Sequence, residues 1–326
     1  MRKGELNDMR KSENYQVGAL LYCPANNKTL AKSITTNRFQ GKYSLALCLE
    51  DTINDKKVRE AELDMMESLR TIEDSLNAGN EFYLPKIFIR VRQAEQIERL
   101  IRELGDTAKI VTGFNLPKFN LENAPAYLEA IDKTSIIKPD IKFMPILESP
   151  DLANIRKRAD FLYELKDVIA PFEDKITNIR VGGNDLCHIY GLRRHSTETI
   201  YDIKPVAAAL TDILSVFLTD YVVSGPVFEY YNGEGWDAAL TRECGKDVAA
   251  GFVGKTAIHP KQIAIINNAL AVLREDYEDA KQILNWDTAD STYVKGNSTN
   301  SRMNEVKTHL NWAERTVALA DYYGIK

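Results

Sequence analysis

Eight short apolar runs alternate with segments of helical character, and this alternation constrains the fold more than any other feature of the chain. The runs lie at 17–23, 44–49, 86–91, 110–116, 141–148, 176–181, 220–223 and 252–258. Between them the pattern is helical; Leu63, Met66 and Leu69, for example, recur at the spacing of one helix face. Strands that alternate with helices pair in parallel, and eight of them favour a closed barrel over an open doubly wound sheet. We therefore expect an α/β protein, a (β/α)8 TIM barrel with a C-terminal helical extension.

The two ends of the chain depart from this pattern. Residues 1–15 are expected to form a polar N-terminal arm, 16–284 the barrel, and 285–326 a mobile loop followed by a C-terminal helix. Within that helix, Leu310, Ala313 and Val317 form an apolar stripe too small for the helix to stand alone. We expect it to cap a neighbouring subunit, which predicts a homo-oligomer.

Composition excludes several classes of protein. With 44% hydrophobic and 27% charged residues, the 326-residue chain can bury a large core, and its net charge of −5 gives no reason to expect nucleic acid or an anionic membrane as partner. No apolar run reaches the roughly 18 residues of a membrane span, and the polar start is no signal peptide, so we expect a cytoplasmic protein. Cys23, Cys48, Cys187 and Cys244 lack C-x-x-C spacing, which favours reduced thiols over a zinc site.

Two acidic residues follow adjacent predicted strands. Glu148 ends the run at 141–148, and Asp185 comes just after the strand at 176–181 and its Gly-Gly pair. In a parallel barrel both would lie at the C-terminal rim, and two carboxylates with room for water and substrate are a usual way to hold Mg²⁺. Alternatively, Glu148 begins a helix and Asp185 is a helix N-cap. Together the two residues favour the metal site.

Other charged residues reach the same predicted rim. Arg90, at the end of the third strand, is suited to grip a substrate carboxylate, or else forms an internal salt bridge with Glu50 or Asp51. Those two acids, after the second strand, could position Arg90 or hold metal-bound water. Lys118 closes the fourth strand and would meet either a substrate anion or a neighbouring acid.

The ordered motifs resemble the citrate lyase β-subunit-like branch of the HpcH/HpaI aldolase family, from about Val17 to Leu273. They are LLYCPANNKTLAKS, LALCLEDTINDKKVREAE, IFIRVR, GFNLPKF, PILESP, VGGNDLCHIYGLRR and GFVGKTAIHPKQIAIINNAL. The resemblance implies a Mg²⁺-dependent carbon–carbon lyase or aldolase that cleaves or forms a β-hydroxy acid, or its thioester, through a metal-stabilised enolate. It places the metal ligands at Glu148 and Asp185 and the carboxylate-binding arginine at Arg90.

The chain also departs from that family. Cys48 stands where the family has the first acid of Asp-Leu-Glu-Asp, with Glu50 and Asp51 as the remaining supporting acids. Relatives that act on CoA esters carry a C-terminal catalytic Asp, for which Glu305 is at best a replacement, so a CoA or carrier thioester substrate does not carry over. Alternatives are a thioester hydrolase or a lyase acting on a sugar-derived intermediate, or a non-catalytic barrel that binds an oxo acid.

Overall fold

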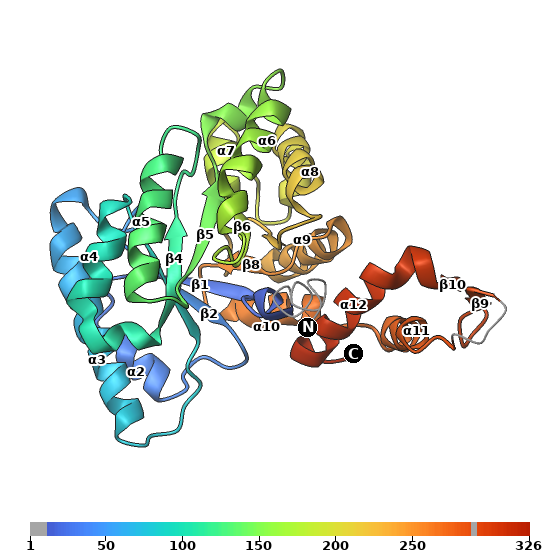
Figure 1. Ribbon diagram of the computed structural model, residues 1–326, viewed down its shortest axis with the longest axis horizontal. Helices are drawn as coiled ribbons and strands as arrows, with labels where there is room; N and C mark the ends of the chain where they lie inside the picture. Colours follow the sequence, from blue (N-terminus) through green and yellow to red (C-terminus); the bar gives the residue numbers. More distant parts are fainter. Residues whose placement is uncertain (1–11, 288–291) are drawn as a thin grey trace. The chain divides into compact units, whose positions relative to one another are not determined.

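Figure 1 shows the computed structural model, which describes residues 12–287 and 292–326. These residues divide into two compact units, residues 17–266 and residues 12–16 with 267–326. Most of the predicted N-terminal arm, and residues 288–291 of the predicted loop, lie outside the described residues. In the described parts of the chain, no helix combines the length and the apolar composition needed to cross a membrane.

The described residues of the larger unit form eight parallel strands. They are β1 (Ala19–Pro24), β2 (Ser44–Cys48), β3 (Lys86–Arg90), β4 (Val111–Leu116), β5 (Lys142–Leu147), β6 (Ile179–Val181), β7 (Val223–Ser224) and β8 (Lys255–Ala257). Strands consecutive in sequence are neighbours from β1 to β7, and β8 pairs with β1. Gly225, directly after β7, bridges to Lys255 of β8, so the sheet closes into the predicted barrel.

Helices follow the strands and surround the barrel (Figure 1). They are α2 (Leu30–Thr35), α3 (Val58–Asn77), α4 (Glu95–Leu104), α5 (Ala124–Ile137), α6 (Arg158–Ile169), α7 (Gly183–Ile189), α8 (Lys204–Phe217) and α9 (Trp236–Ala250), while α10 (Lys261–Leu270) spans the boundary between the units. Short 3-10 helices η1 to η5 lie at Asp55–Lys57, Gly105–Ile110, Pro150–Ala153, Ala170–Phe172 and Ile200–Asp202. The N-cap of α7 is Gly182, so Asp185 lies inside the first turn and is not the N-cap that the sequence left open as an alternative.

Alternation along the strands separates two apolar regions. Leu47 and Ile89 belong to the main core cluster, which joins the strands to the surrounding helices. Leu20, Phe88 and Met144 form a second buried cluster, which lies inside the barrel because successive strand residues point to opposite faces. Residues two positions further along the same strands therefore also face the barrel interior, nearer its C-terminal end.

The smaller unit contains a helical pair and a short hairpin. Its elements are α11 (Arg274–Leu284), β9 (Val294–Gly296), β10 (Met303–Glu305) and α12 (Val306–Tyr323). Ala313 of α12 is buried against Ala280 and Ile283 of α11, and Val317 packs on them. The apolar stripe of the predicted C-terminal helix thus has a partner in its own chain, and the homo-oligomer stays a prediction. The stretch predicted as a mobile loop also contains β9, which antiparallel pairing to β10 orders.

Candidate active site

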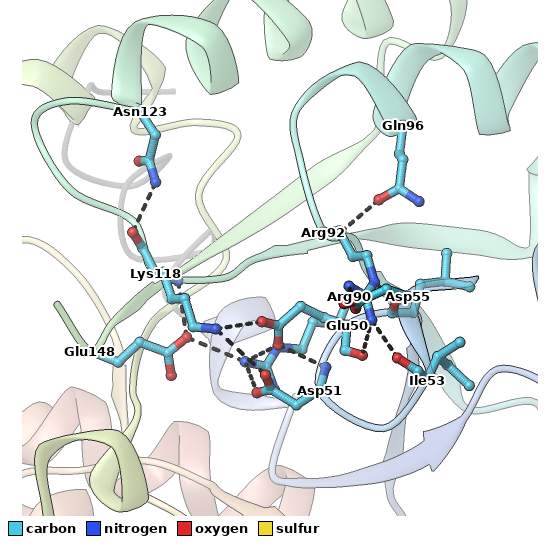
Figure 2. Close-up of polar contacts among 11 residues, drawn as sticks. Glu50, Asp51, Ile53, Asp55, Arg90, Arg92, Gln96, Lys118, Asn123 and Glu148 are labelled. Atoms are coloured by element: carbon cyan, nitrogen blue, oxygen red, sulfur yellow. Dashed lines mark hydrogen bonds and ion pairs between the residues drawn. The ribbon is translucent and has the colours of Figure 1, made fainter. Parts of the chain in front are cut away.

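Arg90 is the centre of a charged cluster at the C-terminal end of the barrel (Figure 2). Its Nη2 atom lies 2.7 Å from Glu50 Oε2, 3.1 Å from Asp51 Oδ2 and 3.3 Å from Glu148 Oε1. The salt bridges to Glu50 and Asp51 that the sequence left open as an alternative are therefore present. These salt bridges leave one donor of Arg90 without a partner: its buried Nε has no hydrogen bond among the described residues.

Lys118 supplies the second cation of this cluster. Its Nζ atom lies 2.7 Å from Glu50 Oε1 and 3.5 Å from Asp51 Oδ1. Its backbone is left-handed, with φ of 51°, a conformation that costs a residue other than glycine about 1–2 kcal/mol. Two contacts hold it there: the Lys118 N–H donates to Glu148 Oε1 (2.9 Å), and its carbonyl accepts from Asn123 Nδ2 (2.9 Å). The strained turn thus fixes the carboxylate of Glu148.

Glu148 is buried, with 2% of its side chain exposed. Burial is the main cause that raises the pKa of this carboxyl to about 8. The positive charge of Arg90 acts to lower this pKa, and the negative charge of Asp185 acts to raise it. Among the described residues, its ion pair and its hydrogen bonds are made by Oε1 alone. The other oxygen, Oε2, lies where a Cβ on Gly182 would be only 2.0 Å away. The glycine after β6 is therefore required by the position of Glu148.

Asp185 lies in the first turn of α7, on the strand-to-helix connection next to Glu148. Its charge contributes to the raised pKa of Glu148, so the two carboxylates predicted to share the rim do act on each other. In the part of the chain that the structure describes, no group of three or more His, Cys, Asp or Glu residues could hold a metal ion. The metal site predicted at Glu148 and Asp185 stays a prediction.

Arg92 holds the loop that carries the two supporting acids, a role that sequence reasoning missed. Its Nε donates to Leu49 O (2.7 Å), and its Nη2 donates to the carbonyls of Glu50 (2.9 Å) and Ile53. Its Nη1 also pairs with Asp55 (2.6 Å). The signal was present in the motif IFIRVR, whose second arginine follows Arg90 by two residues.

Buried ion pairs hold the loops after β6 and β7. Lys255, fully buried in β8, lies 2.7 Å from Glu243 and 2.8 Å from Asp247 on α9. Glu243 also pairs with Arg194 (2.6 Å), which fixes the loop after α7. Gln262 on α10 donates to the carbonyls of Phe228 (2.8 Å) and Tyr230 (2.9 Å). The GKTAIHPKQ segment thus organises the rim through Lys255 and Gln262.

The other candidates are Glu305 and the histidines. Glu305 belongs to the smaller unit, where its N–H donates to His309 Nδ1 (3.1 Å), and its catalytic role stays a prediction. His188 and His195 are exposed. His259 stacks on Tyr231, with 4.6 Å between the ring centroids.

An eight-stranded parallel barrel with acids and bases gathered at the C-terminal ends of its strands is the architecture of a TIM-barrel enzyme. Residues 11–325 match the model of the family described as C–C bond lyase of the TIM-barrel fold. The chain belongs to this family and is a carbon–carbon lyase. This match confirms the predicted carbon–carbon lyase on a TIM barrel.

Solved structures share the fold at low sequence identity. One is the protein CitE from Mycobacterium tuberculosis in complex with magnesium, acetoacetate and coenzyme A; it is 18% identical over 94% of this chain and 99% of its own, with a TM-score of 0.61. RipC from Yersinia pestis is 18% identical over 78% and 95%, with a TM-score of 0.54. The citrate lyase beta subunit from M. tuberculosis, complexed with oxaloacetate and magnesium, is 17% identical over 79% and 98%, with a TM-score of 0.52. No curated protein sequence matches this chain.

Proposed function

We propose that the protein is a Mg²⁺-dependent lyase or aldolase that cleaves or forms a β-hydroxy acid, with Glu148 and Asp185 as the metal ligands. The observation that carries this proposal is the free Oε2 atom of the buried Glu148, placed against Gly182 and beside Asp185. A buried carboxylate with an unengaged oxygen is stabilised by a cation. The similar structures with magnesium and a small oxo acid, oxaloacetate or acetoacetate, support the choice of Mg²⁺ and of substrate class.

Arg90 and Lys118 are proposed to bind and orient the substrate carboxylate. Arg90 has its Nε free for this, and the Lys118 side chain is 53% exposed and so open to a ligand. Glu50 and Asp51 hold both cations in place, because each acid contacts both of them. When bound, Mg²⁺ would stabilise the negative charge that develops on a substrate oxygen during carbon–carbon cleavage.

Glu50 and Asp51 also form a pair suited to proton transfer. Burial raises the pKa of the Glu50 carboxyl, and its hydrogen bond with Asp51 adds to this. Burial acts to raise the pKa of Asp51 as well, but the hydrogen bond with Glu50 and the charges of Arg90 and Lys118 hold it below its usual value. Two adjacent acids with opposite shifts are a common arrangement for general acid–base chemistry. We assign the mobile proton to Glu50.

Shifted chemistry on the same barrel is the second candidate. It is favoured by Cys48, which is fully buried at the end of β2, where the family has an acid. Under that alternative, a thioester or a sugar-derived intermediate would replace the β-hydroxy acid. A panel of hydroxy acids, thioesters and sugar acids, assayed with and without Mg²⁺, separates the candidates by which class is consumed.

The metal site is tested by titrating Mg²⁺ into the purified protein in a calorimeter. Glu148→Ala and Asp185→Ala should each weaken Mg²⁺ binding by roughly tenfold or more, since each removes one of two protein ligands. Glu62→Gln is the matched control, because Glu62 is also buried but pairs with Arg99 (2.6 Å) on the outside of the barrel. Unchanged affinity in both alanine variants would exclude these residues as the metal site.

The carboxylate site is tested on the same metal-loaded protein. Arg90→Lys should lose most of its affinity for pyruvate or oxaloacetate, because an ammonium group cannot replace the fixed fork of guanidinium donors. Equal binding by the lysine variant would mean that Arg90 serves only to hold Glu50, Asp51 and Glu148.

A further inference from the structure

Arg180, in the middle of β6, is a buried cation without a counter-ion. Its flanking residues Ile179 and Val181 join the core under the helices, so Arg180 points into the barrel. It is 1% exposed, and no ion pair involves it among the described residues. Its Nη2 donates to Thr256 Oγ1 (2.6 Å) on β8, while Nε and Nη1 have no hydrogen-bond partner within the described parts of the chain.

Polar groups around Arg180 are also left unpaired. Both side-chain atoms of Asn178, which precedes Arg180 by two residues on β6, are buried without a hydrogen bond among the described residues. Asn115 on β4 donates to the Tyr22 hydroxyl (3.1 Å), but its Oδ1 has no partner in the same set. The barrel interior thus holds a layer of unsatisfied donors and acceptors below the charged rim.

This layer is continuous with the active site. The Arg90 guanidinium lies 5.7 Å from the centroid of the Tyr22 ring, and the Tyr22 hydroxyl acts on the charges of both Arg90 and Arg180. Burial lowers the pKa of Arg180, and the charge of Arg90 adds to this. Tyr22 and Thr256, the two side chains next to Arg180, are partly exposed.

A guanidinium stays charged in proteins, and an unpaired buried charge is among the costliest features of a fold. Glu50, Asp51 and Glu148 pair with Arg90, and no carboxylate pairs with Arg180 among the described residues. An anionic group of a bound molecule would supply the missing counter-ion. Two free guanidinium nitrogens close to the carboxylate-binding Arg90 favour a second anionic group on the same ligand.

We infer that Arg180 binds a second carboxylate of the substrate, so that the lyase acts on dicarboxylic rather than monocarboxylic acids. This inference rests on the proposed function for the other end of the substrate. It adds a residue that selects among oxo acids, and it explains why a fully buried arginine is tolerated without an acidic partner in the fold.

The test compares 2-oxo acids matched in carbon number, titrated into the Mg²⁺-loaded protein: 2-oxobutyrate with oxaloacetate, and 2-oxovalerate with 2-oxoglutarate. In the wild type, the dicarboxylate of at least one pair should bind roughly tenfold tighter, as a charge-assisted contact to arginine requires. In Arg180→Met that preference should disappear, while the affinity for the monocarboxylates changes less than about twofold. Arg180→Lys, which keeps the charge, should retain part of the preference. An unchanged preference in Arg180→Met would overturn the inference.

Melting curves separate this role from a structural one. Without ligand, Arg180→Met should melt at or above the wild-type temperature, because it removes a charge that has no partner. Arg158→Met is the matched control and should melt lower, since the buried Arg158 pairs with Asp212 (2.8 Å). A loss in Arg180→Met as large as in the control would mark Arg180 as structural and overturn the inference.

Different experimental results would contradict the proposed function and the inference about Arg180. If no 2-oxo acid binds in a Mg²⁺-dependent way, the proposed function is wrong, and malonate added to the metal-free protein then decides on Arg180. Malonate should raise the melting temperature of the wild type by about 2 °C or more and leave that of Arg180→Met unchanged. Equal shifts in the melting temperatures of the two proteins would exclude anion binding by Arg180 altogether.

Discussion

The buried Glu148 makes the stability of the metal-free protein depend on pH in a predictable direction. Its pKa rises from 4.5 to about 8 on folding, chiefly through burial. Because the folded protein binds this proton more tightly than the unfolded chain does, stability falls as the pH rises from 4.5 toward 8. At 1.36 kcal/mol per pKa unit, the ionisation of Glu148 costs about 2 kcal/mol at pH 6 and about 5 kcal/mol at pH 8.5.

Glu148→Gln isolates this contribution, because glutamine resembles the protonated acid and does not titrate. In urea unfolding followed by circular dichroism, with a chelator present, the variant should exceed the wild type in stability by about 2 kcal/mol at pH 6 and by about 5 kcal/mol at pH 8.5. Saturating Mg²⁺ should narrow the gap at pH 8.5, since the cation stabilises only the wild-type carboxylate. A gap that stays constant between the two pH values would refute the assignment of a raised pKa to Glu148.

Glu62→Gln provides the control of opposite sign. Burial acts to raise the pKa of Glu62, but its hydrogen bonds with Arg99 and Gln96 hold that pKa below its usual value. The charged form of Glu62 therefore stabilises the fold above the ordinary pKa of the acid, and this stabilisation is lost as the pH falls. The glutamine variant should be less stable than the wild type at both pH 6 and pH 8.5.

Three further outcomes are expected. Gly182→Ala should reduce Mg²⁺ affinity roughly tenfold in calorimetry, because the new Cβ would lie 2.0 Å from Glu148 Oε2. The control Gly245→Ala on α9, whose new Cβ would have no atom within 4 Å, should leave the Mg²⁺ affinity unchanged. Lys118→Gly should relieve the left-handed backbone at φ of 51° and hold or raise the melting temperature, yet weaken oxo-acid binding by about tenfold through loss of the ammonium group. Truncation after Leu284 removes α12 and its contact with α11. If the predicted homo-oligomer depends on α12, light scattering of the truncated protein will show a smaller particle. An unchanged particle mass would contradict that dependence.

The gathering of the site residues followed from the order of strands and helices alone. Parallel strands bring their C-terminal ends to one rim, so the sequence is enough to place Arg90, Lys118 and Glu148 together. Their pairing could not be predicted in the same way, because it depends on backbone turns beyond the strand ends. The left-handed backbone of Lys118, which aims its N–H at Glu148, follows Pro117 in a way that no periodic pattern records.

Two residues were missed for a different reason. The run at 176–181 alternates polar and apolar residues, and this alternation already assigned Asn178 and Arg180 to one face of β6. Which face is the barrel interior depends on the packing of Ile179 and Val181 under the helices, a tertiary feature. The sequence alone therefore does not show that Arg180 is buried.

The distribution of charge across the site gives the substrate a direction. At the rim, Glu50, Asp51 and Glu148 contact the cations Arg90 or Lys118, and Asp185 acts on Glu148 through its charge; with all six groups ionised the formal charge is −4 + 2 = −2. One divalent cation balances that surplus. Deeper in the barrel, Arg180 carries +1 with no acid beside it among the described residues, and one carboxylate balances it. Under the proposed function, a substrate whose reacting end lies at the rim and whose second carboxylate reaches Arg180 would satisfy both regions at once.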